Sequence, residues 1–385
     1  MIESETMPTK GTKILINGIS ARQGGGQTYL LNLLKYFPNH DTLEVILLIP
    51  HAFPLPPLPA NIKKHTVPRV ETNPFWRAVW EKFFLPKLLQ LWKIDVLYCP
   101  GGVISTVPPQ HCKTVTMFQN MLPFAPKERQ RYPLGYMRFR LWLLQFLQAR
   151  SFRKADLVIF ISHYGKTVID HMIPERSGIS SVIPHGLSDH FRVQGGLPFP
   201  ANLPQDYVLY VSILDVYKAQ MEVVRAWNLL RLQRPTAEKL VLVGPQFPPY
   251  ARKLEALIRA LQLEEEVLLL GAVPYEELPQ YYQHAKINLF ASSCENCPNI
   301  VLEKLASGRP VFLSNYQPMP EFGEEVVEYF DPYTPQELTD LLLKYLDTPA
   351  LREALAQKAL RQAQHFQWQE TAEKTWEALI QLASK

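Results

Sequence analysis

The sequence predicts an α/β protein of two Rossmann-like domains, each with a parallel sheet, facing each other across a cleft. Segments with β-strand character alternate with amphipathic helical segments along almost all of the 385 residues, as in parallel sheets covered by helices. A glycine- and proline-rich stretch at 193–204 is typical of a linker. Residues 1–192 contain 23 Lys and Arg against 12 Asp and Glu, whereas residues 193–385 contain 17 against 24. We therefore expect an N-terminal domain over 1–192, a C-terminal domain over 193–367 and a final helix over 368–385.

The composition is that of a globular protein, with 47% hydrophobic and 20% charged residues. Four scattered cysteines are too few for a disulfide framework, which favours a reducing compartment. The first ten residues contain acids and no apolar core, so we expect no signal peptide. No apolar run reaches the roughly 18 residues of a transmembrane helix. These features predict a cytoplasmic protein.

A glycine-rich turn follows the first predicted strand. Residues 13–17 form this strand, and Gly24, Gly25 and Gly26 precede an amphipathic helix over 28–37. Because glycine has no Cβ, the backbone amides of such a turn can approach a phosphate closely. The spacing matches neither the dinucleotide fingerprint nor a P-loop, and glycine-rich turns also form for steric reasons alone. Phosphate binding is thus one of two interpretations.

The most informative stretch lies near residue 300. A strand over 285–290 is followed by a loop with Glu295 and by a short helix over 300–307 with Glu303. Unpaired amides at a helix entrance can receive phosphate, and a carboxylate one turn further can accept hydrogen bonds from both hydroxyls of a ribose. Phosphate and sugar diol together indicate a nucleotide. The alternative is two glutamates on a solvated surface.

The spacing of Glu295 and Glu303, followed by Leu-Ala-Ser-Gly-Arg-Pro-Val over 305–311, resembles the signature of the group 1 retaining glycosyltransferases. These are metal-independent enzymes of the GT-B fold that transfer a sugar from a nucleotide diphosphate. The resemblance covers nearly the whole chain and is strongest over 205–330. It implies that the first glutamate lies beside the donor sugar, that the second binds the ribose, and that the last helix returns to the N-terminal domain. It implies no cofactor and no metal.

The same resemblance assigns further residues to the donor. Lys218 would hold the diphosphate and stabilise it as the leaving group, so Glu295 and Lys218 are the catalytic candidates. Ser212 and Ile213 stand where the family usually has Gly and Arg, so one cation is missing. Either Lys218 and helix amides suffice, or an arginine from elsewhere reaches the site. The implied donor-binding residues are Gly25, Gly26, Ser212, Lys218, Val273, Glu295, Pro298, Asn299, Ile300 and Glu303.

Three residues are candidates for contact with the sugar or the acceptor. Gln119 and Asn120 replace the His-Asp pair that the family usually has after this strand, and an amide can still hydrogen-bond a sugar hydroxyl. His185 lies in a turn at the domain junction, where sugar contact and hinge packing are both open. No enzymic base is obvious, so the departing phosphate is expected to take the acceptor proton.

The function that the resemblance implies is transfer of a hexose from a nucleotide-diphosphate sugar to a glycan or lipid-linked acceptor, in the synthesis of cell-surface polysaccharide or glycolipid. Two alternatives remain: a sugar-nucleotide epimerase or phosphorylase of the same fold, and a non-catalytic sugar-nucleotide-binding protein. Cys294 and Cys297 have the spacing of half a zinc site, but a second pair is absent from the sequence.

Two aromatic segments are candidates for a surface partner. Residues 127–154 contain eight Lys and Arg against one acid, interleaved with aromatic residues. A solvated face, nucleic acid, anionic lipid and a diphosphate-bearing acceptor are the alternatives; we favour a membrane-proximal acceptor at the inner face and expect no nucleic acid. In the second segment, Trp76, Trp80, Phe83 and Phe84 recur at helical spacing. There we expect a core helix rather than an interfacial one.

Overall fold

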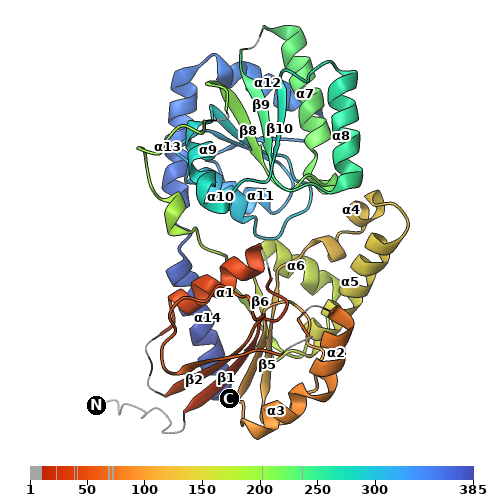
Figure 1. The fold of residues 1–385 in the computed structure, drawn as a ribbon, viewed down its shortest axis with the longest axis vertical. Coiled ribbons are helices and arrows are strands. Elements are labelled where there is room, and N and C mark those ends of the chain that lie inside the picture. Colours follow the sequence, from red (N-terminus) through yellow and green to blue (C-terminus); the bar gives the residue numbers. More distant parts are fainter. Residues whose placement is uncertain are drawn as a thin grey trace. The chain divides into compact units, whose positions relative to one another are not determined.

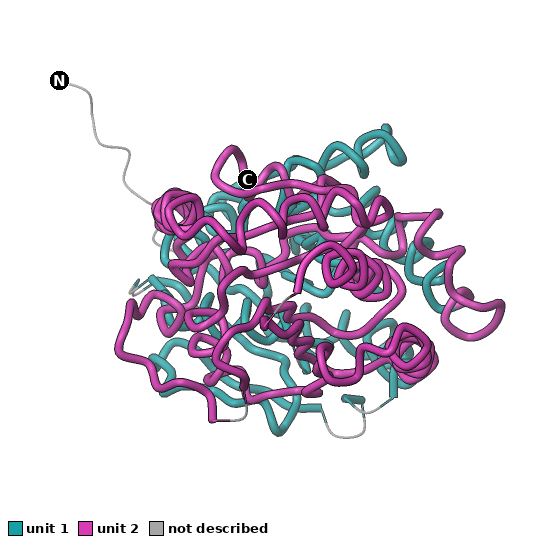
Figure 2. The backbone as a smooth tube through the Cα atoms, turned by 90° about the horizontal axis from the view of Figure 1, so that it is seen from above, with its two compact units in different colours: residues 1–120, 140–185, 368–385 teal, residues 121–139, 186–367 magenta. Residues whose placement is uncertain are grey.

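The computed structural model describes residues 11–22, 24–38, 40, 42–67, 70, 71, 73–201, 203–235 and 237–385. The ten N-terminal residues, on which the signal-peptide prediction rests, lie outside this set. The chain forms two compact units (Figure 1, Figure 2). Unit 1 comprises Met1–Asn120, Arg140–His185 and Trp368–Lys385, and unit 2 comprises Met121–Phe139 and Gly186–Gln367.

Unit 1 is built on a seven-stranded parallel sheet of order β3-β2-β1-β4-β5-β6-β7. This order contains the 3-2-1-4-5-6 arrangement of a doubly wound fold. The central strands are apolar along their length because helices pack on the sheet; Leu15, Val96 and Val115 are fully buried. The strands are β1 (Thr12–Asn17), β2 (Leu43–Leu48), β3 (Ile62–His65), β4 (Val96–Cys99), β5 (Lys113–Phe118), β6 (Leu157–Phe160) and β7 (Ile179–Val182).

Helices of unit 1 begin at recognisable caps and include the end of the chain. The side chain of Asn73 accepts a hydrogen bond from Phe75 N (2.9 Å) at the start of α2, as expected for an N-cap before proline. The final helix lies against α1, where Trp376 Nε1 donates to Leu33 O (3.0 Å). The helices are α1 (Gly25–Lys35), α2 (Pro74–Phe83), α3 (Leu85–Leu91), α5 (Tyr136–Lys154, in unit 1 from Arg140), α6 (His163–Met172) and α14 (Trp368–Ala383).

Unit 2 repeats this plan with a six-stranded parallel sheet of order β10-β9-β8-β11-β12-β13. Its strands are β8 (Tyr207–Val211), β9 (Lys239–Val243), β10 (Val267–Gly271), β11 (Ile287–Phe290), β12 (Val311–Ser314) and β13 (Glu328–Phe330). Its helices are α4 (Pro126–Arg131), α7 (Gln220–Gln233), α8 (Pro248–Ala260), α9 (Leu278–His284), α10 (Asn299–Leu305), α11 (Met319–Gly323), α12 (Pro335–Leu346) and α13 (Pro349–Ala363). Short 3-10 turns are η1 (Leu122–Phe124), η2 (Asp189–Phe191), η3 (Val216–Lys218) and η4 (Tyr275–Glu277). The predicted α/β class with two parallel-sheet domains is confirmed.

Strand order reverses at one place in each sheet. In unit 1 the neighbours β1 and β4 are separated in sequence by two strands, and in unit 2 the same holds for β8 and β11. Ligands of doubly wound sheets bind outside the carboxyl ends of the strands at such a switch point. In unit 1 the glycine-rich turn follows β1, and in unit 2 the segments around Lys218 and Glu295 follow β8 and β11.

The core helix predicted at residues 74–84 is found only in part, because Trp80 packs against the core cluster whereas the other aromatic side chains do not. In α2 only Glu81 is buried, whereas Phe75, Trp76 and Phe83, as well as the following Phe84, are each more than half exposed. Packing in this region is supplied instead by buried leucines of α3. Helical periodicity reveals an apolar stripe, but it does not reveal whether another element covers that stripe.

One smaller expectation also differs from the structure. The helix after the glycine-rich turn begins at Gly25 rather than Thr28, with Gly24 at φ +67° in the N-cap position, so Gly25 and Gly26 belong to the first helical turn.

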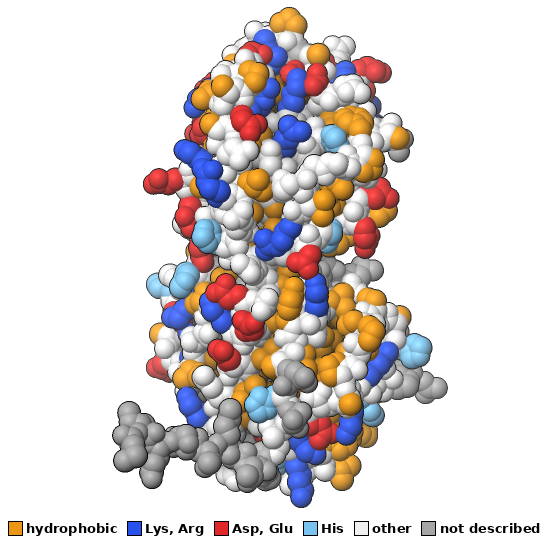
Figure 3. Space-filling view, turned by 90° about the vertical axis from the view of Figure 1, so that its left-hand side faces the viewer, with side chains coloured by type: hydrophobic (Ala, Val, Ile, Leu, Met, Phe, Trp, Pro, Cys, Tyr) orange, Lys and Arg blue, Asp and Glu red, His pale blue; other side chains and the backbone are white. Residues whose placement is uncertain are grey.

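Positive and negative side chains are mixed on the surface of the protein. On the side of the molecule drawn in Figure 3, Lys and Arg side chains are interspersed with Asp and Glu. The excess of positive charge in the N-terminal half of the sequence is therefore not a single-sign surface on this side. None of the helices in the described part of the chain combines the length and apolar character needed to cross a bilayer.

Candidate active site

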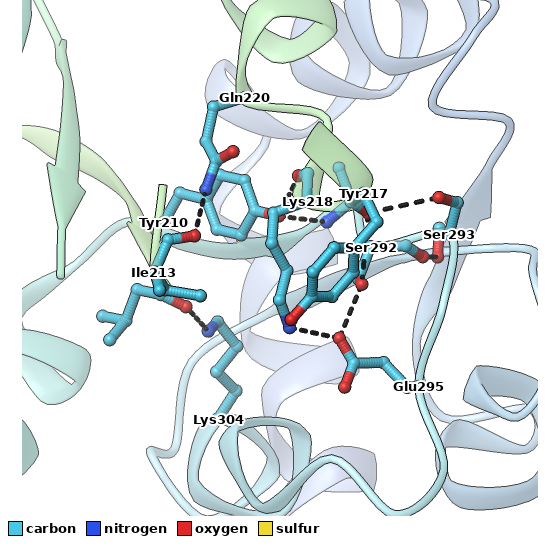
Figure 4. A network of polar contacts seen from close by, with 12 residues as sticks. Tyr210, Ile213, Tyr217, Lys218, Gln220, Ser292, Ser293, Glu295 and Lys304 are labelled. Carbon is cyan, nitrogen blue, oxygen red and sulfur yellow. Dashed lines mark hydrogen bonds and ion pairs between the residues drawn. The ribbon is translucent and has the colours of Figure 1, made fainter. Parts of the chain in front are cut away.

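Two oppositely charged side chains meet at the switch point of unit 2. Lys218 ends η3, which follows β8, and Glu295 lies in the loop that follows β11. Their separation in sequence is 77 residues, yet Lys218 Nζ and Glu295 Oε1 form an ion pair (Figure 4). The topology places these segments together, because β8 and β11 are adjacent parallel strands whose carboxyl ends lie at one edge of the sheet.

The ion pair is largely shielded from water. The side chains of Lys218 and Glu295 are 6% and 15% exposed. Ser292 Oγ donates a second hydrogen bond to Glu295 Oε1 (2.5 Å). The lysine ammonium also lies over the rings of Tyr217 and Phe290, 4.8 and 4.9 Å from their centroids. These contacts fix the position of a cation and a carboxylate that the sequence predicts as catalytic.

Hydrogen bonds hold the two segments in register. Tyr210 OH donates to Lys218 O and accepts from Ala291 N (3.3 Å). The backbone of Ser293 donates to Tyr217 O (2.8 Å), so the segment after β11 is tied to η3 a second time. The ammonium and carboxylate are thereby supported by backbone contacts on both sides.

Glu303 is buried and receives one hydroxyl on each oxygen. Tyr275 OH donates to Oε1 and Tyr282 OH donates to Oε2, each at 3.0 Å. Burial raises the pKa of Glu303 above its ordinary 4.5, although both tyrosine hydrogen bonds and the charge of Lys304 oppose the rise. Two hydroxyl donors on one carboxylate are the arrangement that a vicinal diol would also provide. Sequence reasoning missed both tyrosines, because tyrosines in helical segments are more often core residues.

The loop with Val273, which the resemblance assigns to donor binding, lies next to this carboxylate. Val273 follows β10 by two residues, and Tyr275 begins η4 directly after Pro274. Because Tyr275 donates to Glu303, this loop is held at the buried glutamate. The side chain of Tyr275 is 36% exposed, so its hydroxyl is the more displaceable of the two partners.

The helix that carries Glu303 is one residue shorter than expected. Pro298 occupies the N-cap position of α10, and Asn299 and Ile300 are its first helical residues. The helix spans seven residues, so the anion site predicted from its amides rests on about two turns. The contribution of these amides to phosphate binding stays a prediction.

A buried lysine lies where the sequence leaves a cation missing. Ile213 is partly exposed and uncharged, and Ser212 is buried, with no hydrogen-bond partner for its Oγ among the described residues. Lys304 reaches the end of β8 from α10, where its Nζ donates to Val211 O (3.3 Å). Sequence reasoning missed Lys304, although a lysine beside Glu303 in an otherwise apolar run of the sequence was a usable signal.

The candidate binding residues of unit 1 lie in two separate regions. A Cβ at Gly26 would lie 3.8 Å from Gln119 Oε1, so the start of α1 and the end of β5 meet at the carboxyl edge of the sheet. Asn120, the next residue, is exposed. His185 is instead buried in an aromatic cluster, with ring centroids 5.5 Å from Tyr29 and 5.1 Å from Trp368.

The cysteine pair shows no sign of metal chemistry in its surroundings. Cys294 and Cys297 are buried free thiols. Burial is the main cause that raises the pKa of Cys294 well above its ordinary value, with Glu295 adding to the rise, so this thiol disfavours the thiolate form that binds metal. Among the described residues, no three His, Cys, Asp or Glu side chains are grouped to hold a metal ion.

Comparisons with protein families and curated proteins match both halves of the chain. Residues 23–191 match Glycosyltransferase Family 4, and residues 198–362 match Glycosyl transferases group 1. O-antigen chain mannosyltransferase B of Escherichia coli is 27% identical over 172 residues, which cover 44% of this chain and 45% of that protein. D-inositol 3-phosphate glycosyltransferase of Kineococcus radiotolerans is 31% identical over 202 residues, 48% of this chain and 46% of that protein. The chain spans about half the length of the curated relatives it matches.

Solved structures resemble the chain over nearly its whole length. Sucrose-phosphate synthase of Thermosynechococcus elongatus superposes with a TM-score of 0.75 at 18% identity, covering 97% of this chain and 99% of that one. Anabaena Alr3699/HepE in complex with UDP and glucose gives a TM-score of 0.70 at 19% identity, covering 96% and 99%. At these identities the likeness establishes the fold.

Proposed function

Because the chain belongs to the group 1 glycosyltransferases, we propose that it transfers a hexose from a nucleotide-diphosphate sugar to a glycan or lipid-linked acceptor. The transfer proceeds with retention of anomeric configuration and without a metal ion. The product is a cell-surface polysaccharide or glycolipid. The observation that carries this proposal is the shielded ion pair of Lys218 and Glu295 at the switch point of unit 2, inside the segment that matches the group 1 family.

Lys218 is proposed to stabilise the leaving group. A diphosphate gains negative charge as the bond to the sugar breaks, and a fixed ammonium in a shielded site offsets that charge without reorganising. Glu295 places a carboxylate next to this ammonium, beside the proposed position of the donor sugar. The departing phosphate takes the proton of the acceptor hydroxyl.

Glu303 is proposed to bind the ribose of the donor. Its two oxygens already accept two hydroxyl hydrogen bonds, so a ribose diol would replace chemically equivalent donors. Tyr275 then moves away from the carboxylate, and the loop with Val273 lies beside the base. Support for a nucleotide donor comes from the structural neighbour Anabaena Alr3699/HepE, which is described in complex with UDP and glucose.

The acceptor is proposed to be presented at a membrane through α5. Phe139, Trp142 and Phe146 are each more than half exposed, and the sequence contains no acid between 132 and 155. Exposed aromatic side chains among arginines and lysines suit the interface of an anionic bilayer. Since the cytoplasmic leaflet is anionic, we place the enzyme at the inner face of the membrane.

Donor screening tests the proposal directly. Thermal shift against UDP-, GDP-, ADP- and dTDP-sugars should identify one base that stabilises the protein. The selected donor, labelled in its sugar, is then incubated with a lipid extract with and without EDTA. We expect a labelled lipid product of retained configuration at equal rates in both. A protein stabilised by none of these donors would refute the nucleotide site, and binding without transfer would indicate a non-catalytic protein.

A further inference from the structure

We propose that Lys304 is a second, buried cation of the donor site, which takes up a proton when the donor diphosphate binds beside Lys218. This inference rests on the proposed function and assigns a role to a residue that the reaction described above does not use. Figure 4 shows Lys304 extending from α10 to the end of β8, next to Ile213, while Lys218 approaches from η3.

The first argument is the position of the ammonium group. Lys304 Nζ donates to the carbonyl of Val211, the last residue of β8, and thus lies at the ligand-binding edge of the sheet. Its distance to the Phe290 ring centroid is 5.1 Å, and that of Lys218 Nζ to the same centroid is 4.9 Å. The two nitrogens are therefore no more than about 10 Å apart, close enough for charge on one to act on ligands of the other.

The second argument is the lack of compensation for a charge at Lys304. The residue is 0% exposed. Among the described residues, the Lys304 side-chain nitrogen Nζ makes one hydrogen bond, to Val211 O. No carboxylate of these residues lies within ion-pair distance of Nζ. An ammonium can donate three hydrogen bonds, and a buried cation without a counter-charge is costly. The empty site therefore disfavours the protonated lysine.

Burial outweighs the opposing carboxylates near Lys304 and favours its neutral form. Burial is the largest cause that lowers the pKa of Lys304 well below 10.5; Lys218 lowers it further, and Glu303 and Glu295 oppose the shift. Tyr282, whose ring lies 5.1 Å from Nζ, stays neutral because burial raises its own pKa. A diphosphate would add about two negative charges near these groups, which favours the protonated lysine.

The third argument is the charge balance of the empty site. The positive charge of Lys218 is already matched by Glu295, so this pair leaves little net charge for a dianion. The guanidinium of Arg131 is a second nearby positive charge, which interacts electrostatically with Asp215, just before η3. This guanidinium is already paired with Glu128 at 2.9 Å. Protonation of Lys304 supplies the missing positive charge when, and only when, the anion is present.

Calorimetry with defined nucleotides tests the proposal. UDP, GDP, ADP and dTDP are titrated into the protein at about pH 8, where the nucleotide itself is fully ionised, in buffers of different ionisation enthalpy. The dependence of heat on buffer gives the number of protons taken up. The wild type should take up a proton with the nucleoside diphosphate that binds and none with the matching nucleoside, which lacks the phosphates.

The Lys304→Met variant keeps the volume of the side chain without its charge. It should lose the proton uptake and bind the diphosphate about tenfold more weakly, the size of one charge interaction across roughly 10 Å at an effective dielectric of 20, with nucleoside binding unchanged. Lys344→Met is the matched control, because Lys344 pairs with Glu328 on the same unit; it should behave as wild type.

Each outcome of this experiment decides one question. Binding of a diphosphate by the wild type without proton uptake, or unchanged uptake by the Lys304→Met variant, overturns the role of Lys304 and leaves the proposed function standing. The wild-type measurement decides even where the variant fails to fold. Failure of all four diphosphates to bind overturns the proposed function together with this inference.

Discussion

Replacing Lys218 by methionine separates the structural role of the ion pair from its chemical role. The variant removes the cation and leaves Glu295 as a carboxylate that is 15% exposed. Breaking one side of a buried pair costs about 3–5 kcal/mol. The Ser292 hydrogen bond to the carboxylate remains and offsets about 1.5 kcal/mol, so the variant should lose about 1.5–3.5 kcal/mol of unfolding free energy.

The double variant Lys218→Met with Glu295→Gln should recover most of that stability, because neither charge then remains buried alone. Its activity should not recover. The loss of leaving-group stabilisation lowers kcat by about 10²- to 10³-fold in the single variant, and the second change restores no cation. Urea denaturation followed by tryptophan fluorescence measures stability, and sugar transfer from the selected donor measures kcat.

A matched control lies in the same unit. Lys286 pairs with Glu238 at 2.9 Å, and the side chain of Glu238 is 5% exposed. Because Glu238 keeps Arg234 at 3.6 Å, Lys286→Met should lose less stability than Lys218→Met, while kcat stays at the wild-type value. If the double variant regained both stability and activity, Lys218 would serve only to balance the charge of Glu295, and its assignment to the leaving group would be refuted.

Three further predictions follow from burial and exposure. Glu303→Gln should raise the melting temperature at neutral pH, because burial raises the pKa of Glu303 and the ionised carboxylate weakens the fold above that pKa. The same variant should bind a nucleoside diphosphate about tenfold more weakly. Unchanged affinity would contradict the assignment of Glu303 to the ribose. Lys304→Met should be more stable than wild type at pH 7, because a buried lysine with a lowered pKa costs folding free energy below its unfolded pKa. This cost fades as pH rises toward 10.5, so the difference between the two proteins should shrink. A melting-temperature difference independent of pH would count against a neutral Lys304. The double variant Trp142→Ser/Phe146→Ser should bind vesicles of phosphatidylglycerol and phosphatidylcholine about tenfold or more weakly than wild type. The control Leu232→Ser, which changes a residue of α7 that is 70% exposed, should bind them like wild type. Equal binding by the double variant and the control would exclude α5 from the membrane contact.

The sequence predicts most of the fold because buried parallel strands are apolar along their length. The strands that it misses are the edges of the first sheet. β3 and β7 are four residues each; Lys63 and Lys64 are exposed in β3, and β7 contains the partly buried Ser180 and Ser181. An edge strand pairs on one side and tolerates polar residues, so its composition does not distinguish it from a loop.

The candidate site was predictable in part. The pairing of Lys218 and Glu295 follows from strand order, once two segments after adjacent strands both contain a charge. The hydroxyl partners of Glu303 and the burial of Lys304 were not accessible in this way, because the spacing of residues along a helix gives their face but not what lies opposite. The exposed aromatic side chains of α2 were missed for the same reason.

The last helix has a consequence for the order in which the protein is made. Trp376 of α14 is buried in unit 1, where its indole bonds to Leu33, although more than 300 residues are synthesised between them. On the ribosome, the whole of unit 2 is therefore exposed to the cytosol before the first unit receives its final layer. During that interval the surface of α1 that α14 later covers is exposed to water.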